Sequence, residues 1–268
     1  MALKDIIFAY THFKEIYINF LMFKTRKDGL YFHMTKKRVY IGIDLAWGRK
    51  NRSGFCVIDD TLHIIEIGLL LSNEEILNKI SFYQQNHQLK VAVDAPLCVN
   101  NAQGNRDIEN QFNKDFAKYK IAMLPVNRTL LLKMFDHIRG ETLKDALFKV
   151  GFSFDLQNDF ALSEVYPHAT LAVCFNDYKI LPYKRKKGRS VVEIKKALQT
   201  YQEYMQQTFQ PHPFLRQNID LLKGQSLKDH EDCLDALISA YTLYYALHHP
   251  ERCRTYQSSS GAVFTTPI

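Results

Sequence analysis

The chain has 268 residues, of which 46% are hydrophobic and 24% are charged. This composition excludes a disordered protein and is sufficient for one sizeable hydrophobic core. The formal net charge of +7 favours a polyanionic partner, although a basic balance alone does not identify one. The five cysteines include no CxxC pair, which argues against a zinc site or a disulfide-linked partner and indicates a reducing, cytoplasmic compartment.

The first 33 residues differ in character from the rest of the chain. They are rich in aromatic and aliphatic side chains, but Lys14 and Glu15 divide them into two short apolar blocks. Neither block is long enough to span a bilayer and no small-residue cleavage site follows, so we expect neither a membrane anchor nor a secretory signal. Because Met34 opens a segment that resembles a natural protein start, we expect residues 1–33 to be non-native or loosely ordered.

From Val39 onward the chain alternates between predicted strands and helices. Three apolar segments separated by short turns predict an antiparallel meander, and two later segments that follow helices predict parallel strands. The predicted strands are 39–45, 54–58, 62–71, 90–95 and 161–166. The predicted helices are 72–88, 108–117, 129–150, 169–174, 191–207 and 228–248. We therefore expect one α/β domain over residues 34–250, with a mixed five-stranded sheet flanked by helices, a helical insertion and a flexible tail at 251–268.

A single carboxylate lies at or near the carboxyl end of three of these apolar strands. These are Asp44 in VYIGIDLAW, Asp94 in KVAVDAPL and Glu164 in LSEVYPHAT. An unpaired buried carboxylate is costly, so such a group is usually paired, hydrogen-bonded or bound to a metal. Because ligands bind at this edge of an open α/β sheet, we expect the three acids to converge there.

A further group of acids lies on the last predicted helix, in the segment DHEDCLDALISAY. Asp232 and Asp235 are three residues apart, so they project from one face of the helix, beside an apolar stripe. Acids at a helix start also complement the positive end of its dipole, which is an alternative explanation for Asp229 and Glu231. Asp235 lies deeper in the helix, where this explanation is weaker.

Carboxylates in this arrangement suit hard cations such as Mg²⁺ and Mn²⁺, which prefer oxygen ligands. Two such ions held ~3.5–4 Å apart activate a water and stabilise the leaving oxygen of a phosphodiester. The sequence therefore predicts a metal-dependent nuclease or phosphodiesterase. Its predicted catalytic residues are Asp44, Asp94, Glu164 and Asp235, and its predicted metal ligands are these four together with Asp232.

The order of the elements, with acids on the first, fourth and fifth strands and the last helix, resembles the ribonuclease H-like superfamily. The motifs GIDLAW, VAVDAPL, EVYPHAT and DCLDALISAY more closely resemble the DUF429 family, whose members are described as predicted nucleases of that fold. The resemblance covers roughly residues 39–247. It implies a nucleic-acid substrate and a metal site formed by the same acids.

Four basic residues are candidate contacts for substrate phosphates. Arg106, in NRDIE, matches an Arg-Asp-containing segment of the family, and either contacts a phosphate or is an exposed helix-start residue. Lys184, Arg185 and Lys187 belong to the basic run YKRKKGR, which either neutralises phosphates or forms a solvated, mobile loop.

Two further residues near the acids have open roles. His168 either acts as a proton donor or metal neighbour, or caps the helix that follows it. Trp47 either lines the cleft or packs into the core.

Two alternatives to a nuclease remain. An actin- or sugar-kinase-like phosphotransferase also opens with a strand that carries an aspartate, and Gly48, Ser53 and Gly54 would form its first phosphate turn. Such a protein needs a second lobe and a second glycine-rich loop, which the sequence does not show. A catalytically inactive ribonuclease H-like binding module is the other alternative, and the full set of acids argues against it.

Overall fold

The structure is a computed structural model that describes residues 25–26, 29–30, 36–258, 261 and 263–268. The chain divides into two units, Met1–Lys37 and Arg38–Ile268. In the first unit, β1 (Thr25–Arg26) pairs antiparallel with β2 (Gly29–Leu30). The rest of the N-terminal extension expected at residues 1–33 lies outside the described residues. Within the described part of the chain, no helix combines the length and apolar character needed to cross a membrane.

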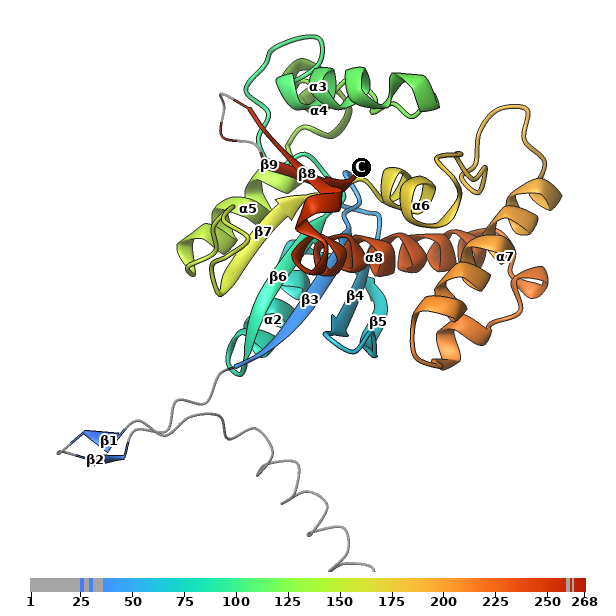
Figure 1. Cartoon of the computed structure of the whole chain (residues 1–268). Helices are drawn as coiled ribbons and strands as arrows, with labels where there is room; N and C mark the ends of the chain where they lie inside the picture. The colour runs from blue at the N-terminus through green and yellow to red at the C-terminus, as the bar shows by residue number, and fades with distance from the viewer. Residues whose placement is uncertain (1–24, 27–28, 31–35, 259–260, 262) are drawn as a thin grey trace, which may run out of the picture. The chain divides into compact units, whose positions relative to one another are not determined.

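The second unit is built on one mixed sheet with the strand order β5-β4-β3-β6-β7-β9-β8 (Figure 1). Its strands are β3 (Lys37–Asp44), β4 (Ser53–Asp59), β5 (Ile64–Leu70), β6 (His87–Val93), β7 (Phe160–Glu164), β8 (Cys253–Gln257) and β9 (Val263–Pro267). Strands β3, β4 and β5 form the predicted antiparallel meander, and β6 and β7 are parallel. The prediction of an α/β domain with a mixed sheet is confirmed.

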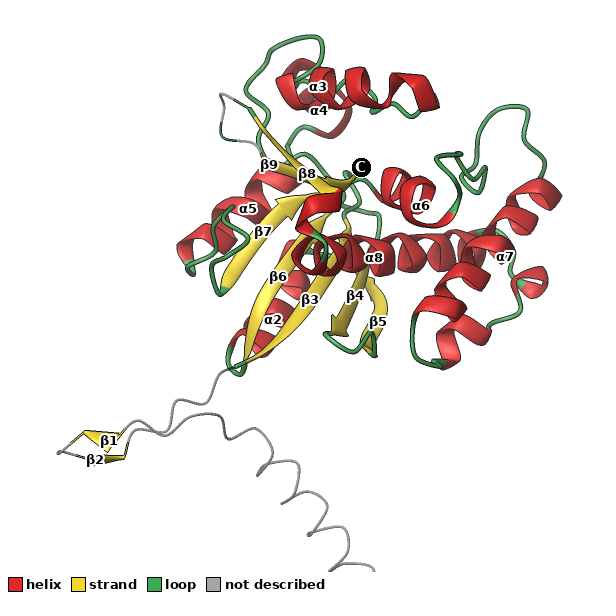
Figure 2. Cartoon of the chain, in the orientation of Figure 1, coloured by secondary structure: helices red, strands yellow, loops and turns green. Residues whose placement is uncertain are grey.

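Helices cover both faces of this sheet (Figure 2). They are α2 (Asn73–Gln84), α3 (Asp107–Phe116), α4 (Arg128–Phe135), α5 (Arg139–Lys149), α6 (Pro167–Phe175), α7 (Val191–Thr208) and α8 (Gln225–His248). Alternate residues of β3 point to opposite faces, as a strand requires. Ile41 and Ile43 pack with α2 and α5, whereas Tyr40 packs with α7 and α8. The parity of the strand therefore places Asp44 on the α8 side.

Two predicted elements differ from the structure. The tail expected to be flexible at 251–268 contains β8 and β9, and Phe264 in β9 is fully buried, so the sheet has seven strands rather than five. In the sequence, the polar residues between these strands obscure two segments whose β-branched residues suit a sheet. The helix predicted over 129–150 is interrupted, because Asp136 adopts a left-handed conformation (φ 61°) that ends α4.

Helix α8 lies directly on β3 and β4, where two glycines leave room for it. A Cβ atom on Gly42 would lie 1.9 Å from the Ala236 carbonyl oxygen, and one on Gly54 would lie 2.0 Å from the Asp232 carbonyl oxygen. Both obstacles are backbone atoms, which move only if the helix moves. This close approach fixes the position of Asp232 relative to the ends of the strands.

We expect Gly42→Ala to lower the free energy of unfolding by about 3 kcal/mol, because the new methyl group forces α8 away from the sheet. Urea denaturation measures the effect. Gly68→Ala in β5 is the matched control, since a Cβ there meets no atom within 4 Å. The control is expected to change the free energy of unfolding by less than about 1 kcal/mol. Equal losses in the two variants would contradict this packing of α8.

Candidate functional site

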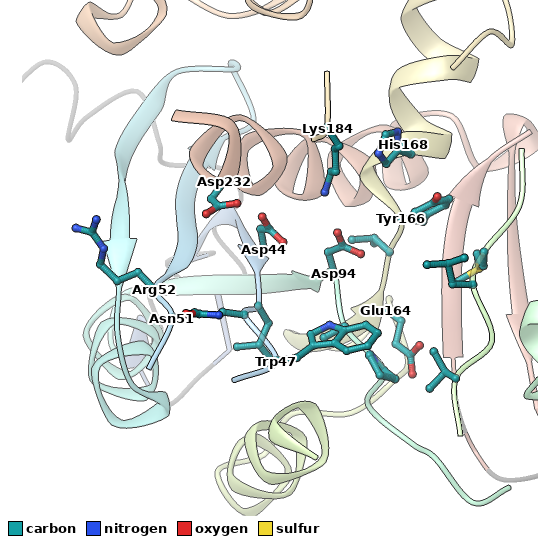
Figure 3. Close-up of a pocket in the computed structure, with 18 of the residues that line it drawn as sticks. Asp44, Trp47, Asn51, Arg52, Asp94, Glu164, Tyr166, His168, Lys184 and Asp232 are labelled. Carbon is teal, nitrogen blue, oxygen red and sulfur yellow. The ribbon is translucent and has the colours of Figure 1, made fainter. Parts of the chain in front are cut away.

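A cleft of about 670 Å³ opens where β3, β6 and β7 end, next to the start of α8. Asp44 is the last residue of β3, and Asp94 directly follows β6. The backbone amide of Asp94 donates a hydrogen bond to the Ile43 carbonyl at 2.8 Å, which sets the two strand ends side by side. The carboxylates of Asp44, Asp94 and Asp232 all line the cleft (Figure 3). Glu164 lines it as well, so four of the five predicted metal ligands share one cavity.

The charges of Asp44 and Asp94 are poorly compensated. Among the ion pairs of the described residues, none within 4 Å includes either carboxylate. Burial raises the pKa of Asp44 well above its ordinary value, and the neighbouring aspartates add to this effect against the opposing charge of Lys184. Burial likewise raises the pKa of Asp94, to about 7. Near neutral pH these carboxyl groups are therefore partly protonated, and a bound cation would displace the proton.

Lys184 brings a positive charge to these acids. Its Nζ atom lies 2.7 Å from Oδ2 of the fully buried Asp235. Figure 3 shows its ammonium pointing toward Asp44 and Asp94. Burial on its own lowers the pKa of Lys184, but the attraction of Asp235, Asp44 and Asp94 outweighs it, so the pKa is raised and the ammonium stays charged.

Asp235 anchors this lysine and does not line the cleft. The Tyr183 hydroxyl donates a hydrogen bond to Asp235 Oδ1 at 2.7 Å, and the Tyr201 hydroxyl donates to the same atom at 3.2 Å. Because Tyr183 immediately precedes Lys184, these bonds fix the base of the basic loop. Neither tyrosine was predicted from the sequence to belong to the site. An aromatic residue at the start of the basic run was the one available signal for Tyr183.

Glu164 and Arg106 form a buried ion-pair cluster with Glu109. Arg106 Nη1 donates to Glu164 Oε1 at 2.9 Å, and Nη2 donates to Oε2 at 2.8 Å. Arg106 Nε donates to Glu109 Oε1 at 2.7 Å, and the Leu97 amide donates to Glu164 Oε1 at 2.7 Å. All three charged residues are at most 4% exposed. The charges of Glu164 and Arg106 therefore neutralise each other, and their hydrogen bonds link the end of β7 to the start of α3.

The remaining candidates divide between the cleft and the surface. Asp232 is paired with Lys228, and both line the cleft. Arg185 and Lys187 are exposed and are not among the residues that line the cleft. His168 lines the cleft and stacks on Tyr183 with ring centroids 4.8 Å apart. Burial lowers the pKa of His168 to about 4, so the imidazole is neutral at neutral pH.

The acids fit a divalent cation in part. Within the described residues, no three His, Cys, Asp or Glu side chains are grouped closely enough to hold a metal ion by themselves. Mg²⁺, however, is usually held by one or two carboxylates together with waters and substrate phosphates. Asp44 and Asp94 meet that requirement, because both face the cleft outside any ion pair.

Charge balance also favours a cation at this position. We call Asp44, Asp94, Asp232 and Asp235 the aspartate cluster. When ionised it carries four negative charges, against which Lys184 supplies one positive charge and Lys228 supplies another that it shares with the buried Glu231. A divalent ion would offset the excess negative charge, which is otherwise costly to bury.

Fold and site together define a three-layer α/β protein with a cleft at the carboxyl edge of its sheet, lined by both acidic and basic side chains. A family model described as "Protein of unknown function (DUF429)" matches residues 42–259. The chain therefore belongs to the DUF429 family, which confirms the resemblance of its four motifs. Comparisons with curated proteins and with solved structures give no match.

Proposed function

We propose that this protein is a divalent-metal-dependent nuclease of the ribonuclease H-like type, which hydrolyses phosphodiester bonds in nucleic acid. The observation that carries the proposal is the pair of unpaired carboxylates, Asp44 and Asp94, at the ends of adjacent strands in one cleft. The meander β3–β5 followed by parallel β6 and β7 supports the ribonuclease H-like assignment, to which the β8–β9 hairpin is an addition.

In this proposal Asp44 and Asp94 hold one Mg²⁺ or Mn²⁺, and Asp232 lines the same cleft beside them. The cation supplies Lewis acidity that neutralises phosphate charge and favours ionisation of an attacking water. Lys184 places its ammonium beside the acids, where it neutralises charge on the substrate phosphate. Lys50 and Arg52 also line the cleft and attract a polyanion toward it.

A cleavage assay tests this function directly. Labelled single-stranded, duplex and branched DNA and RNA are incubated with the purified chain and Mg²⁺ or Mn²⁺. We expect at least one of these substrates to be cut, and we expect EDTA to stop the reaction. Absence of cleavage of every substrate with both ions would contradict the proposal.

The two alternatives have less support. A two-lobed phosphotransferase is disfavoured because all seven strands described in Arg38–Ile268 belong to a single sheet. An inactive binding module has no need of two partly buried, unpaired carboxylates, whose raised pKa values mark an energetic cost of folding. Such a cost is typical of a functional site.

Replacing Lys184 is expected to separate cation binding from catalysis. Lys184→Met removes the positive charge that competes with a cation for the aspartate cluster, so Mn²⁺ should bind about tenfold more tightly. The same change removes the ammonium that faces the substrate phosphate, so kcat should fall. Calorimetric titration with Mn²⁺ and a cleavage time course measure the two quantities.

Lys186→Met is the matched control, because Lys186 is an exposed residue of the same loop and does not line the cleft. We expect it to leave Mn²⁺ affinity unchanged. Weaker Mn²⁺ binding in Lys184→Met than in the control would contradict the proposed position of the cation.

A further inference from the structure

We propose that the cleft receives an unpaired strand of nucleic acid, with nucleobases stacked against Trp47 and Tyr166 on either side of Asp44 and Asp94. This inference rests on the proposed function and adds the conformation of the substrate. Both aromatic residues line the cleft and are only partly buried. Figure 3 shows the acids with Trp47 on one side and Tyr166 and His168 on the other.

Trp47 is held rigidly at the edge of the cleft. It lies three residues after Asp44, and the residue before it, Ala46, is fixed at both backbone groups. The Ala46 amide donates to the Ser53 hydroxyl at 3.1 Å, and its carbonyl accepts a hydrogen bond from Arg139 Nη1 at 2.9 Å. The indole also packs edge-on against Phe135, with ring centroids 5.9 Å apart. A rigid aromatic side chain loses little entropy when a base stacks on it.

Tyr166 is positioned in a similar way at the end of β7. Its ring packs edge-on against the buried Phe112, with centroids 5.9 Å apart, and lies 5.6 Å from the His168 ring. Its hydroxyl donates to the Ala122 carbonyl at 3.4 Å. Tyr166 is thus a second aromatic side chain fixed beside the acids.

The dimensions and lining of the cleft favour a single strand over a duplex. A volume of about 670 Å³ lies in the range of small-ligand sites and receives individual nucleotides. In a duplex the bases are stacked inside the helix, out of reach of aromatic side chains. A single strand offers the π-face of every base, and stacking of this kind depends little on sequence. Met123 and Leu124 extend the apolar wall of the cleft, and Leu124 is 80% exposed.

The position of Trp47 allows a test without mutation, because it is the only tryptophan of the chain. Indole fluorescence is recorded while the full chain is titrated in EDTA with a short single-stranded oligonucleotide. An abasic strand of equal length and the matching duplex are titrated in parallel, and binding of each labelled strand is followed by anisotropy. We expect saturable quenching by the base-containing single strand, little quenching by the other two, and weaker binding of the abasic strand.

A variant adds a second readout. Tyr166→Leu should weaken binding of the single strand about tenfold, in keeping with the loss of one stacked base. Phe82→Leu on α2 is the matched control, because Phe82 is 65% exposed and does not line the cleft. It should leave the affinity unchanged.

The outcomes separate this inference from the proposed nuclease. Equal affinity for the abasic and base-containing strands, or strand binding without any change in Trp47 fluorescence, would overturn base stacking even if the protein cleaves nucleic acid. Quenching by the single strand without cleavage under any divalent-ion condition would support base stacking and overturn the nuclease.

Discussion

Asp44→Asn is expected to abolish metal-dependent cleavage while leaving the fold intact. Loss of a group that merely supports a metal ligand costs about 10- to 100-fold in activity or affinity, so loss of a direct ligand should cost more than about 100-fold. The amide has nearly the shape of the carboxylate but lacks its charge. A cleavage time course at saturating Mn²⁺ measures the loss.

Asp44→Asn should also be more stable than the unaltered protein, by an amount that grows as pH increases. Burial raises the pKa of Asp44, so above the unfolded-state value of about 3.9 the folded protein holds a proton that the unfolded chain has released. Folding is therefore penalised progressively as pH rises through this window, and the penalty is absent from Asp44→Asn. Urea denaturation should show similar stabilities of the two proteins near about pH 4 and an advantage of the variant toward neutral pH.

Glu203→Gln on α7 is the matched control for charge, because Glu203 is exposed and lies outside the cleft. We expect it to retain full activity and the pH profile of the unaltered protein. Full activity in Asp44→Asn would remove Asp44 from the mechanism. A loss of activity together with a lower stability at neutral pH would mean that Asp44 is structural.

Arg106→Met is expected to cost about 3–5 kcal/mol in the free energy of unfolding, the usual consequence of removing one partner from a buried ion pair. The substitution would leave Glu109 and Glu164 buried without their cation. It would also release the link between the end of β7 and the start of α3. Chemical denaturation with fluorescence detection measures the change.

Two further variants make this prediction specific. Arg254→Met breaks an exposed pair with Asp115 and should cost less than about 1 kcal/mol. Adding Glu164→Gln to Arg106→Met removes one of the stranded charges and should recover part of the lost stability. Unchanged stability with weakened nucleic-acid binding in Arg106→Met would instead assign Arg106 to a substrate phosphate.

Several features of the fold could be predicted because they depend on local patterns. The apolar runs ending at Asp44 and Asp94 identify β3 and β6, and the direction of parallel crossovers places their ends at one edge. The β8–β9 hairpin could not be predicted in this way. Its strands are short, the residues between them are polar, and Glu164, which pairs with Phe264 across the sheet, lies far away in the sequence.

The roles of the other acids depend on long-range pairing that local patterns do not reveal. Glu164 has the same sequence context as Asp94, but Arg106, 58 residues away, neutralises it. Asp235 is similarly anchored by Tyr183, 52 residues away, and by Lys184. The sequence therefore predicts which acids are buried near the sheet edge, whereas only the fold distinguishes those that are already paired.

The central claim is that Asp44 and Asp94 share a divalent cation, and equilibrium binding of Mn²⁺ tests it most directly. Calorimetric or paramagnetic-resonance titrations compare the unaltered chain with Asp44→Asn and Asp94→Asn in the absence of nucleic acid. We predict saturable binding to the unaltered chain and marked weakening in each variant, with proton release on binding. No saturable binding to the unaltered chain, or equal affinity in all three proteins, would contradict the claim.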